Sequence, residues 1–115
     1  MAYSVSGSLT YTFEGRGAFS LTTAGKNMGM INTVSMVGGT LTLQDSFSST
    51  TSPSITLNRG TINSNGFSVT GNKFTFAGTG VRGITMGSSI WTVTGSDSGV
   101  FPWDISTSTN FTLNA

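Results

Sequence analysis

Cysteine and histidine are both absent from this 115-residue chain, and charged side chains make up only 8% of it. Without cysteine there is no disulfide framework and no thiolate metal site, and without histidine the commonest general base and metal ligand is missing. The five basic side chains are scattered singly, so no basic stripe can neutralise the phosphates of a nucleic acid. We therefore expect no cofactor, no metal ion and no nucleic-acid partner.

Long hydrophobic runs are missing too, and none approaches the roughly 20 apolar residues that span a bilayer. The sequence begins Met1-Ala2-Tyr3-Ser4, which supplies neither the basic n-region nor the apolar h-region of a signal peptide. We expect neither membrane insertion nor export by an ordinary signal peptide.

Small polar residues dominate the chain, because Gly, Ser, Thr and Asn together fill 62 of the 115 positions. Disordered chains combine few aromatic residues with a high net charge, whereas this chain has eight Phe, two Trp, two Tyr and a net charge of +1. Apolar residues alternate with Thr or Ser in short segments such as Leu41–Leu43, Ile55–Leu57 and Trp91–Val93. A period of two indicates β-strands, and the intervening Gly, Asn and Ser suit turns. The pattern predicts an all-β protein.

Strands this short, with Thr or Ser outward and single apolar side chains inward, are typical of coils stacked as a parallel β-solenoid. An antiparallel β-sandwich or jelly roll is the alternative, because Asn65-Gly66 favours a two-residue hairpin turn. The segment Met30 to Val37 fits a strand better than a short helix. We predict one continuous domain, with residues 1–38 as an N-terminal β segment and candidate attachment region and residues 39–115 as a β-repeat region.

An internal similarity links the stretch from Asp45 to Asn58 with the stretch from Asp104 to Asn114, when a short gap is allowed. On this alignment the sequence ends just after a strand, with no charged cap. A solenoid coil without its neighbour exposes strand edges and apolar side chains. We therefore expect that the chain is one piece of a longer array or that its open end meets another subunit.

Three phrases in the second part of the chain resemble a repeat in uncharacterised virion proteins of bacteriophages and in large bacterial surface proteins. They are Gly39 to Asp45, Leu57 to Val69, and Ile90 to Gly95 leading to the segment from Trp103 to Asn114. The resemblance covers about residues 39–114. It implies a β-rich structural or adhesive element and brings no catalytic motif.

The segment Phe101-Pro102-Trp103-Asp104, with Trp91 one coil away, concentrates aromatic residues outside the regular strands. Aromatic rings beside polar side chains stack on sugar rings or anchor protein interfaces. The alternative is that both Trp side chains fill a loop or a coil end. The candidate ligand or interface residues are Trp91, Phe101, Trp103 and Asp104.

Other motifs favour structure over chemistry. The GxGxxG pattern of Gly78–Gly83 precedes strand-like alternation rather than the helix that dinucleotide binding needs, so it predicts a loop between coils. No two of the four carboxylates cluster in the sequence, and we predict no catalytic residue and no enzyme. Thr-X-Thr pairs are typical of outward strand positions and give only weak support to an ice-binding array. The carboxylates are Glu14, Asp45, Asp97 and Asp104, and the pairs are Thr10/Thr12, Thr40/Thr42 and Thr92/Thr94.

Taken with the resemblance, these patterns predict a non-enzymatic structural protein of a bacteriophage particle, a rigid β-rich element that decorates the head or forms part of a fibre. Its expected partners are copies of itself and other virion proteins, and its expected location is the surface of the virion. Two alternatives stay open. One is a module that binds a glycan or receptor on the host surface, and the other is a segment of a bacterial surface adhesin.

Overall fold

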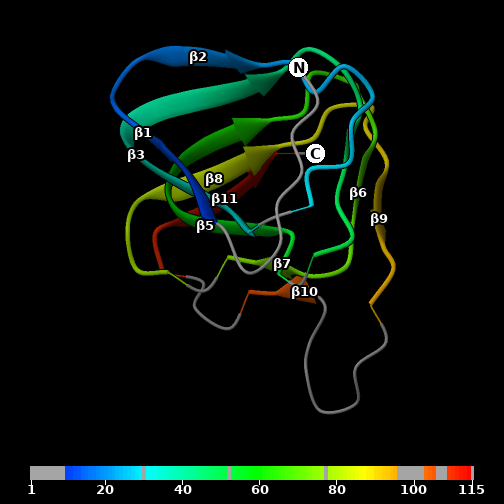
Figure 1. Ribbon diagram of the computed structural model, residues 1–115. Coiled ribbons are helices and arrows are strands. Elements are labelled where there is room, and N and C mark those ends of the chain that lie inside the picture. The colour runs from blue at the N-terminus through cyan, green and yellow to red at the C-terminus, as the bar shows by residue number, and fades with distance from the viewer. Residues whose placement is uncertain are drawn as a thin grey trace.

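The computed structural model describes residues 10–29, 31–51, 53–76, 78–95, 103–105 and 109–114. Within these ranges the chain contains no helix, and its strands stack as a β-solenoid of about four turns (Figure 1). Every described strand pair is parallel. The prediction of a parallel solenoid is confirmed, and the antiparallel sandwich is wrong.

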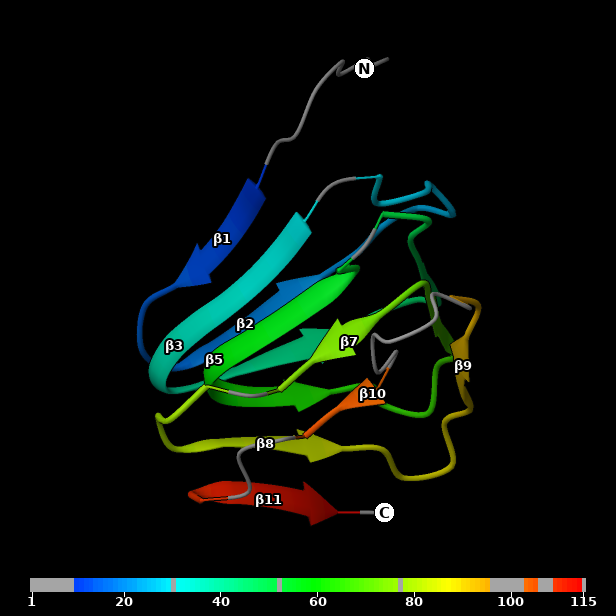
Figure 2. The ribbon, with the colours of Figure 1, turned by 90° about the horizontal axis from the view of Figure 1, so that it is seen from below.

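The strands form three faces, and each coil crosses the faces in the same order (Figure 2). Face 1 carries β1 (Thr10–Glu14), the first half of β3 (Ile31–Leu43), the first half of β5 (Ile55–Asn63), β7 (Phe74–Thr75) and β10 (Trp103–Asp104). Face 2 carries β2 (Ala18–Leu21), the second halves of β3 and β5, β8 (Arg82–Thr85) and β11 (Phe111–Asn114). Face 3 carries β4 (Phe47–Ser48), β6 (Val69–Gly71) and β9 (Trp91–Val93).

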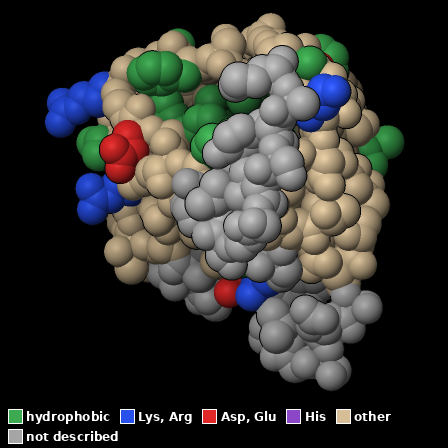
Figure 3. Space-filling view, viewed as in Figure 1, with side chains coloured by type: hydrophobic (Ala, Val, Ile, Leu, Met, Phe, Trp, Pro, Cys, Tyr) green, Lys and Arg blue, Asp and Glu red, His purple; other side chains and the backbone are tan. Residues whose placement is uncertain are grey.

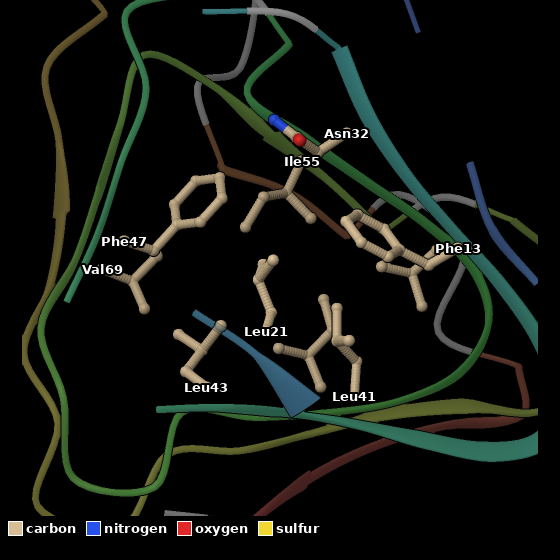
Figure 4. Close-up of a pocket in the computed structure, with 10 residues that line it drawn as sticks. Phe13, Leu21, Asn32, Leu41, Leu43, Phe47, Ile55 and Val69 are labelled. Atoms are coloured by element: carbon tan, nitrogen blue, oxygen red, sulfur yellow. The ribbon is translucent and has the colours of Figure 1, made fainter. Parts of the chain in front are cut away.

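The in-register stacking of parallel strands arranges side chains in columns that run along the solenoid. Alternation along each strand turns apolar side chains inward and hydroxyls outward. On face 1 an outward column of Thr12, Thr33, Thr56 and Thr75 ends on Asp104. The inward columns of the three faces meet in one core, where side chains such as Leu43, Phe47 and Ile55 point toward one another (Figure 4).

Glycine at the corner between faces 1 and 2 lets neighbouring coils approach closely. Gly60 has a φ of +93°, and a Cβ there would lie 2.5 Å from the carbonyl oxygen of Met36 in the coil below. Asn65 and Gly66 also adopt positive φ, as a tight turn requires. This turn leads from face 2 to face 3 instead of reversing the chain, so the hairpin prediction is wrong because the next strand pairs with another coil.

The observed strands confirm one prediction about the order of the chain and contradict another. The segment Met30 to Val37 was predicted as a strand, and β3 confirms this from Ile31 onward. The predicted internal repeat is wrong, because Asp45 lies at a corner after β3 whereas Asp104 lies within β10. The structural repeat is instead a single coil of the solenoid. Phe47, Val69 and Trp91, for example, occupy equivalent positions in three successive coils. The division between residues 38 and 39 falls inside β3.

Replacing Gly60 by alanine tests the close approach of the coils. Gly17 also has a positive φ, +98°, but nothing lies within 4 Å of a Cβ built there. Both Gly17→Ala and Gly60→Ala incur the backbone strain of about 1–2 kcal/mol. Gly60→Ala adds a steric cost of about 1–3 kcal/mol. Urea unfolding should therefore show a clearly lower midpoint for Gly60→Ala, and equal midpoints for the two variants would contradict the packing at this corner.

Candidate functional site

One small apolar cavity lies in the interior of the solenoid. The cavity between faces 1, 2 and 3, shown in Figure 4, has a volume of about 10 Å³. Its walls are apolar apart from Asn32. A cavity of this size holds at most about one water molecule, whereas ligand pockets occupy roughly 300–1,000 Å³. This cavity therefore leaves no room for a small-molecule ligand.

An aromatic cluster fills the C-terminal part of the core and includes two of the candidate residues. Trp91 on β9 and Trp103 on β10 have ring centroids 5.8 Å apart in an edge-to-face arrangement. Phe74 lies 5.2 Å from Trp91 and 5.6 Å from Trp103, also edge to face. Phe76 is 5.1 Å from Trp103 and is stacked on Phe111 at 5.9 Å. Such pairs add roughly 0.5–1.5 kcal/mol each beyond the burial of their area.

Both tryptophans are half-buried, and their rings pack against other aromatic rings. The Trp91 Nε1 atom is buried, and no described group accepts a hydrogen bond from it. The backbone carbonyl of Asp104 accepts a hydrogen bond of 2.8 Å from the Phe76 N–H, and its half-buried side chain continues the threonine column of face 1. Phe101 lies outside the described residues. Trp91 and Trp103 thus pack part of their surface into the core, and the ligand or interface role of these residues stays a prediction.

Arg82 is a buried cation that the sequence analysis did not single out. Its side chain is only 2% exposed and packs over the Phe111 ring, with its guanidinium carbon 5.4 Å from the ring centroid. It donates hydrogen bonds to the carbonyl oxygens of Phe76, Gly80 and Thr109, at 2.7, 3.0 and 2.9 Å. Arg82 therefore fastens the last coil to the coil before it. Isolated arginines are usually exposed, so the sequence offered no signal of this role.

The carboxylates do not form a catalytic pair in the described part of the chain. Glu14 and Asp104 both lie on face 1, but in the first and last coils. The column of Asp104 ends on Thr12, two residues before Glu14, and its four steps of roughly 4.8 Å separate the first and last strands of face 1 by about 19 Å. Glycosidase carboxylates lie within about 10 Å of each other. Asp97 lies outside the described residues, and no three acidic side chains of the described ranges gather into a metal site.

Asp45 ties the first coil to the second. Its Oδ1 accepts hydrogen bonds from the backbone N–H of Thr23 at 2.9 Å and from the Thr23 hydroxyl at 3.0 Å. Its Oδ2 accepts the N–H of Ala24 at 2.6 Å. The backbone N–H of Thr23, helped by the Thr23 hydroxyl and the Ala24 N–H, holds the pKa of Asp45 below its ordinary value. The charge of Asp45 is therefore used to satisfy a corner of the solenoid.

The remaining motifs also take structural positions. Gly78–Gly83 forms the corner between β7 and β8 and runs into β8, so the predicted loop followed by a strand is confirmed, but it lies between two faces of one coil and not between coils. A Cβ on Gly80 would collide with Arg59 and the Asn58 carbonyl, so this glycine allows the corner to lie against β5. The three Thr-X-Thr pairs fall on three different faces and form no common array.

Face 2 carries a hollow of about 310 Å³ that the sequence analysis missed. It arises where Gly83 interrupts an outward column that has Thr40 and Thr61 before it and Thr112 after it. The hollow is open and lined mainly by glycines and threonines, and its only charged lining residue is Arg82, whose guanidinium hydrogen-bonds to backbone carbonyls. No aromatic side chain lines it. The interruption is visible only when the register of the coils is known.

The inward column of face 2 is buried in the middle coils and exposed at both of its described ends. The inward column of face 2 runs through Phe19, Leu41, Ile62, Ile84 and Leu113. The three central members are 4%, 2% and 0% exposed, whereas Phe19 and Leu113 are 43% and 47% exposed. Hydrophobic side chains are visible at the end of the stack that carries β1 and β2 (Figure 3). The exposed ends are the most distinctive surface of the described chain.

Comparison with protein-family models, with curated proteins and with solved structures found no match. Among the described residues, no helix has the length and apolar character needed to cross a membrane. The geometry of the columns and of their ends therefore carries the functional proposal.

The hydrogen bonds of Asp45 predict a pH dependence of stability. Because its folded pKa is lowered, its stabilisation is present above the unfolded pKa of about 3.9 and is lost as pH falls through the folded value. Asp45→Asn should lower the urea unfolding midpoint at neutral pH, and its difference from the natural chain should close in acid. Thr23→Val, which keeps the backbone donor, should retain most of this pH dependence. A difference that is independent of pH would contradict the assignment.

The packing of Trp103 predicts that its side chain contributes to the free energy of unfolding. Trp103→Ala removes packing against Phe74, Phe76 and Trp91 and should cost about 3 kcal/mol in thermal or urea unfolding. Trp103→Phe keeps an aromatic ring and should cost about 1 kcal/mol. A glycan-binding role makes the opposite prediction, in which Trp103→Ala unfolds like the natural chain and loses its signal on a glycan array.

Proposed function

We propose that this chain is a non-enzymatic structural protein of a bacteriophage particle, a rigid β-rich element that decorates the head or forms part of a fibre. The resemblance of residues 39–114 to virion repeats supports the biological setting. The parallel solenoid supports the mechanical role, because its backbone hydrogen bonds run along the stack from coil to coil.

The observation that carries this proposal is the difference in exposure along single columns. Ile84 and Leu113 are neighbours in one column, yet Ile84 is fully buried and Leu113 is 47% exposed. Burying an aliphatic side chain of this size is worth roughly 1.5–3 kcal/mol. An end coil gains that free energy only when another surface covers it, so this geometry favours a part that functions in contact with its neighbours.

The chemistry of the outer faces supports a structural role over catalysis. Outward columns consist mainly of Thr, Ser and Asn, which make hydrogen bonds and carry no charge at neutral pH. The two described acidic side chains of face 1 are far apart, and Asp45 is engaged by backbone N–H groups. These groups suit a passive packing surface.

The two alternatives differ in how well the geometry supports them. A glycan-binding module needs accessible aromatic faces, and Trp91 and Trp103 use theirs against each other and against phenylalanines. A bacterial adhesin segment has the same requirement for covered ends, and it differs from the leading proposal in the particle or cell that carries it.

The proposal predicts that the isolated chain associates in a concentration-dependent way. Sedimentation velocity should show oligomers that change little between roughly 50 and 300 mM salt, because uncharged edges make the contact. Leu113→Ser should weaken association at least tenfold. Ile90→Ser is the matched control, because Ile90 is 69% exposed but lies at a corner between β8 and β9. Since both positions are exposed, neither change should greatly alter the unfolding midpoint.

A chain that stays monomeric at all concentrations would overturn the structural proposal. If it associates, an antibody against the chain should label the head or a fibre of purified phage particles. Label found only on a bacterial surface would favour the adhesin alternative and overturn the phage assignment.

A further inference from the structure

We infer that copies of this chain join head to tail, with β11 of one copy pairing in parallel with β2 of the next. The pairing places Thr112 beside Ala18 of the next copy and continues the columns of face 2 without interruption. This inference rests on the proposed structural function and specifies its partner, which is a second copy of the chain. It also specifies the register.

The two strand edges match in length and direction. β2 and β11 each contain four residues, and both lie at the edge of the sheet with one described partner strand each. β2 pairs with β3 and β11 pairs with β8, both in parallel and both on face 2. The second copy therefore needs only the translation and twist that already relate one coil to the next.

The side chains of the two edges also fit the same columns. Leu113 and Phe19 are the exposed last and first members of one inward column, so the contact places them side by side. Thr112 and Ala18 are the last and first members of the adjacent outward column. On face 1, Trp103 and the exposed Tyr11 hold the equivalent end positions of another column. An aromatic pair would thus form across the same contact.

Charge and steric space favour a second copy at these edges. Neither β2 nor β11 contains a charged residue or a proline, so these two strands carry no like charges that repel each other and lack no backbone donor. Nothing lies within 4 Å of a Cβ position on Gly17, which precedes β2, so in the proposed contact Gly17 leaves room for Phe111 of the neighbouring copy. A contact between two different ends of one chain is heterologous and grows as a filament when it does not close into a ring.

Engineered disulfides test this register directly, because the natural chain has no cysteine. Neighbouring residues on parallel strands lie roughly 4.8 Å apart, within the about 4.4–6.8 Å that a disulfide spans. Under mild oxidation, the double variant Ala18→Cys with Thr112→Cys should give a ladder of covalent oligomers that reductant dissolves. Ser20→Cys with Asn114→Cys is a second in-register pair. These four positions are exposed, so the substitutions should leave the fold intact.

The off-register pair Ala18→Cys with Asn114→Cys is the matched control. Its sulfur-bearing residues would lie about 8 Å apart, too far for a disulfide, so it should give no ladder beyond dimers. A ladder from this pair alone overturns the register. An assembled chain in which neither in-register pair yields more than dimers overturns head-to-tail pairing and leaves the structural function standing. A chain that sediments only as a monomer overturns both.

Discussion

The fully buried apolar side chains of the described chain all lie in coils that have another coil on each side, and this constraint governs how the fold is stabilised. A single coil is too thin to bury its own apolar side chains. Each coil therefore packs on its two neighbours and shields their apolar side chains from water. Backbone hydrogen bonds obey the same rule, because every described strand pairs with strands of adjacent coils. Each additional coil-to-coil interface therefore adds to the free energy of unfolding, and the outer surfaces of the two end coils contribute no such interface.

The scarcity of charge is consistent with this architecture. Backbone groups in the stacked strands are satisfied by neighbouring coils, and outward positions need only small polar side chains. Two of the charged groups present are used internally at corners. Asp45 accepts hydrogen bonds from the backbone N–H groups of Thr23 and Ala24 at a turn. Arg82 donates hydrogen bonds to backbone carbonyl oxygens of its own coil and of the last coil. Each supplies hydrogen bonds that connect two coils where the strands themselves do not.

Alternation along the sequence predicted where the strands lie, because an apolar residue at every second position reports the face of a strand locally. It could not predict the register between coils. Ile55 stacks on Phe74 and Phe74 on Trp103, yet these steps differ in length because the loops between them differ. Hence the sequence could not show that Trp103 meets Trp91 in the core, that Gly83 interrupts a threonine column, or that Arg82 turns inward. It did predict an exposed C-terminal end, because the last strand-like segment carries no charged residue that could cap it.

Proteins that must remain monomeric obstruct their sheet edges with lysine, proline, bulges or a covering segment, since an open edge is a template for another chain. β2 and β11 carry none of these residues, although the chain places Lys26, Lys73 and Pro53 elsewhere. Edge strands with apolar side chains aligned in the same column, and with no charge to keep copies apart, are unfavourable for a solitary domain. They are favourable for a coil that a further coil covers, because the contact that removes the edge also completes the core.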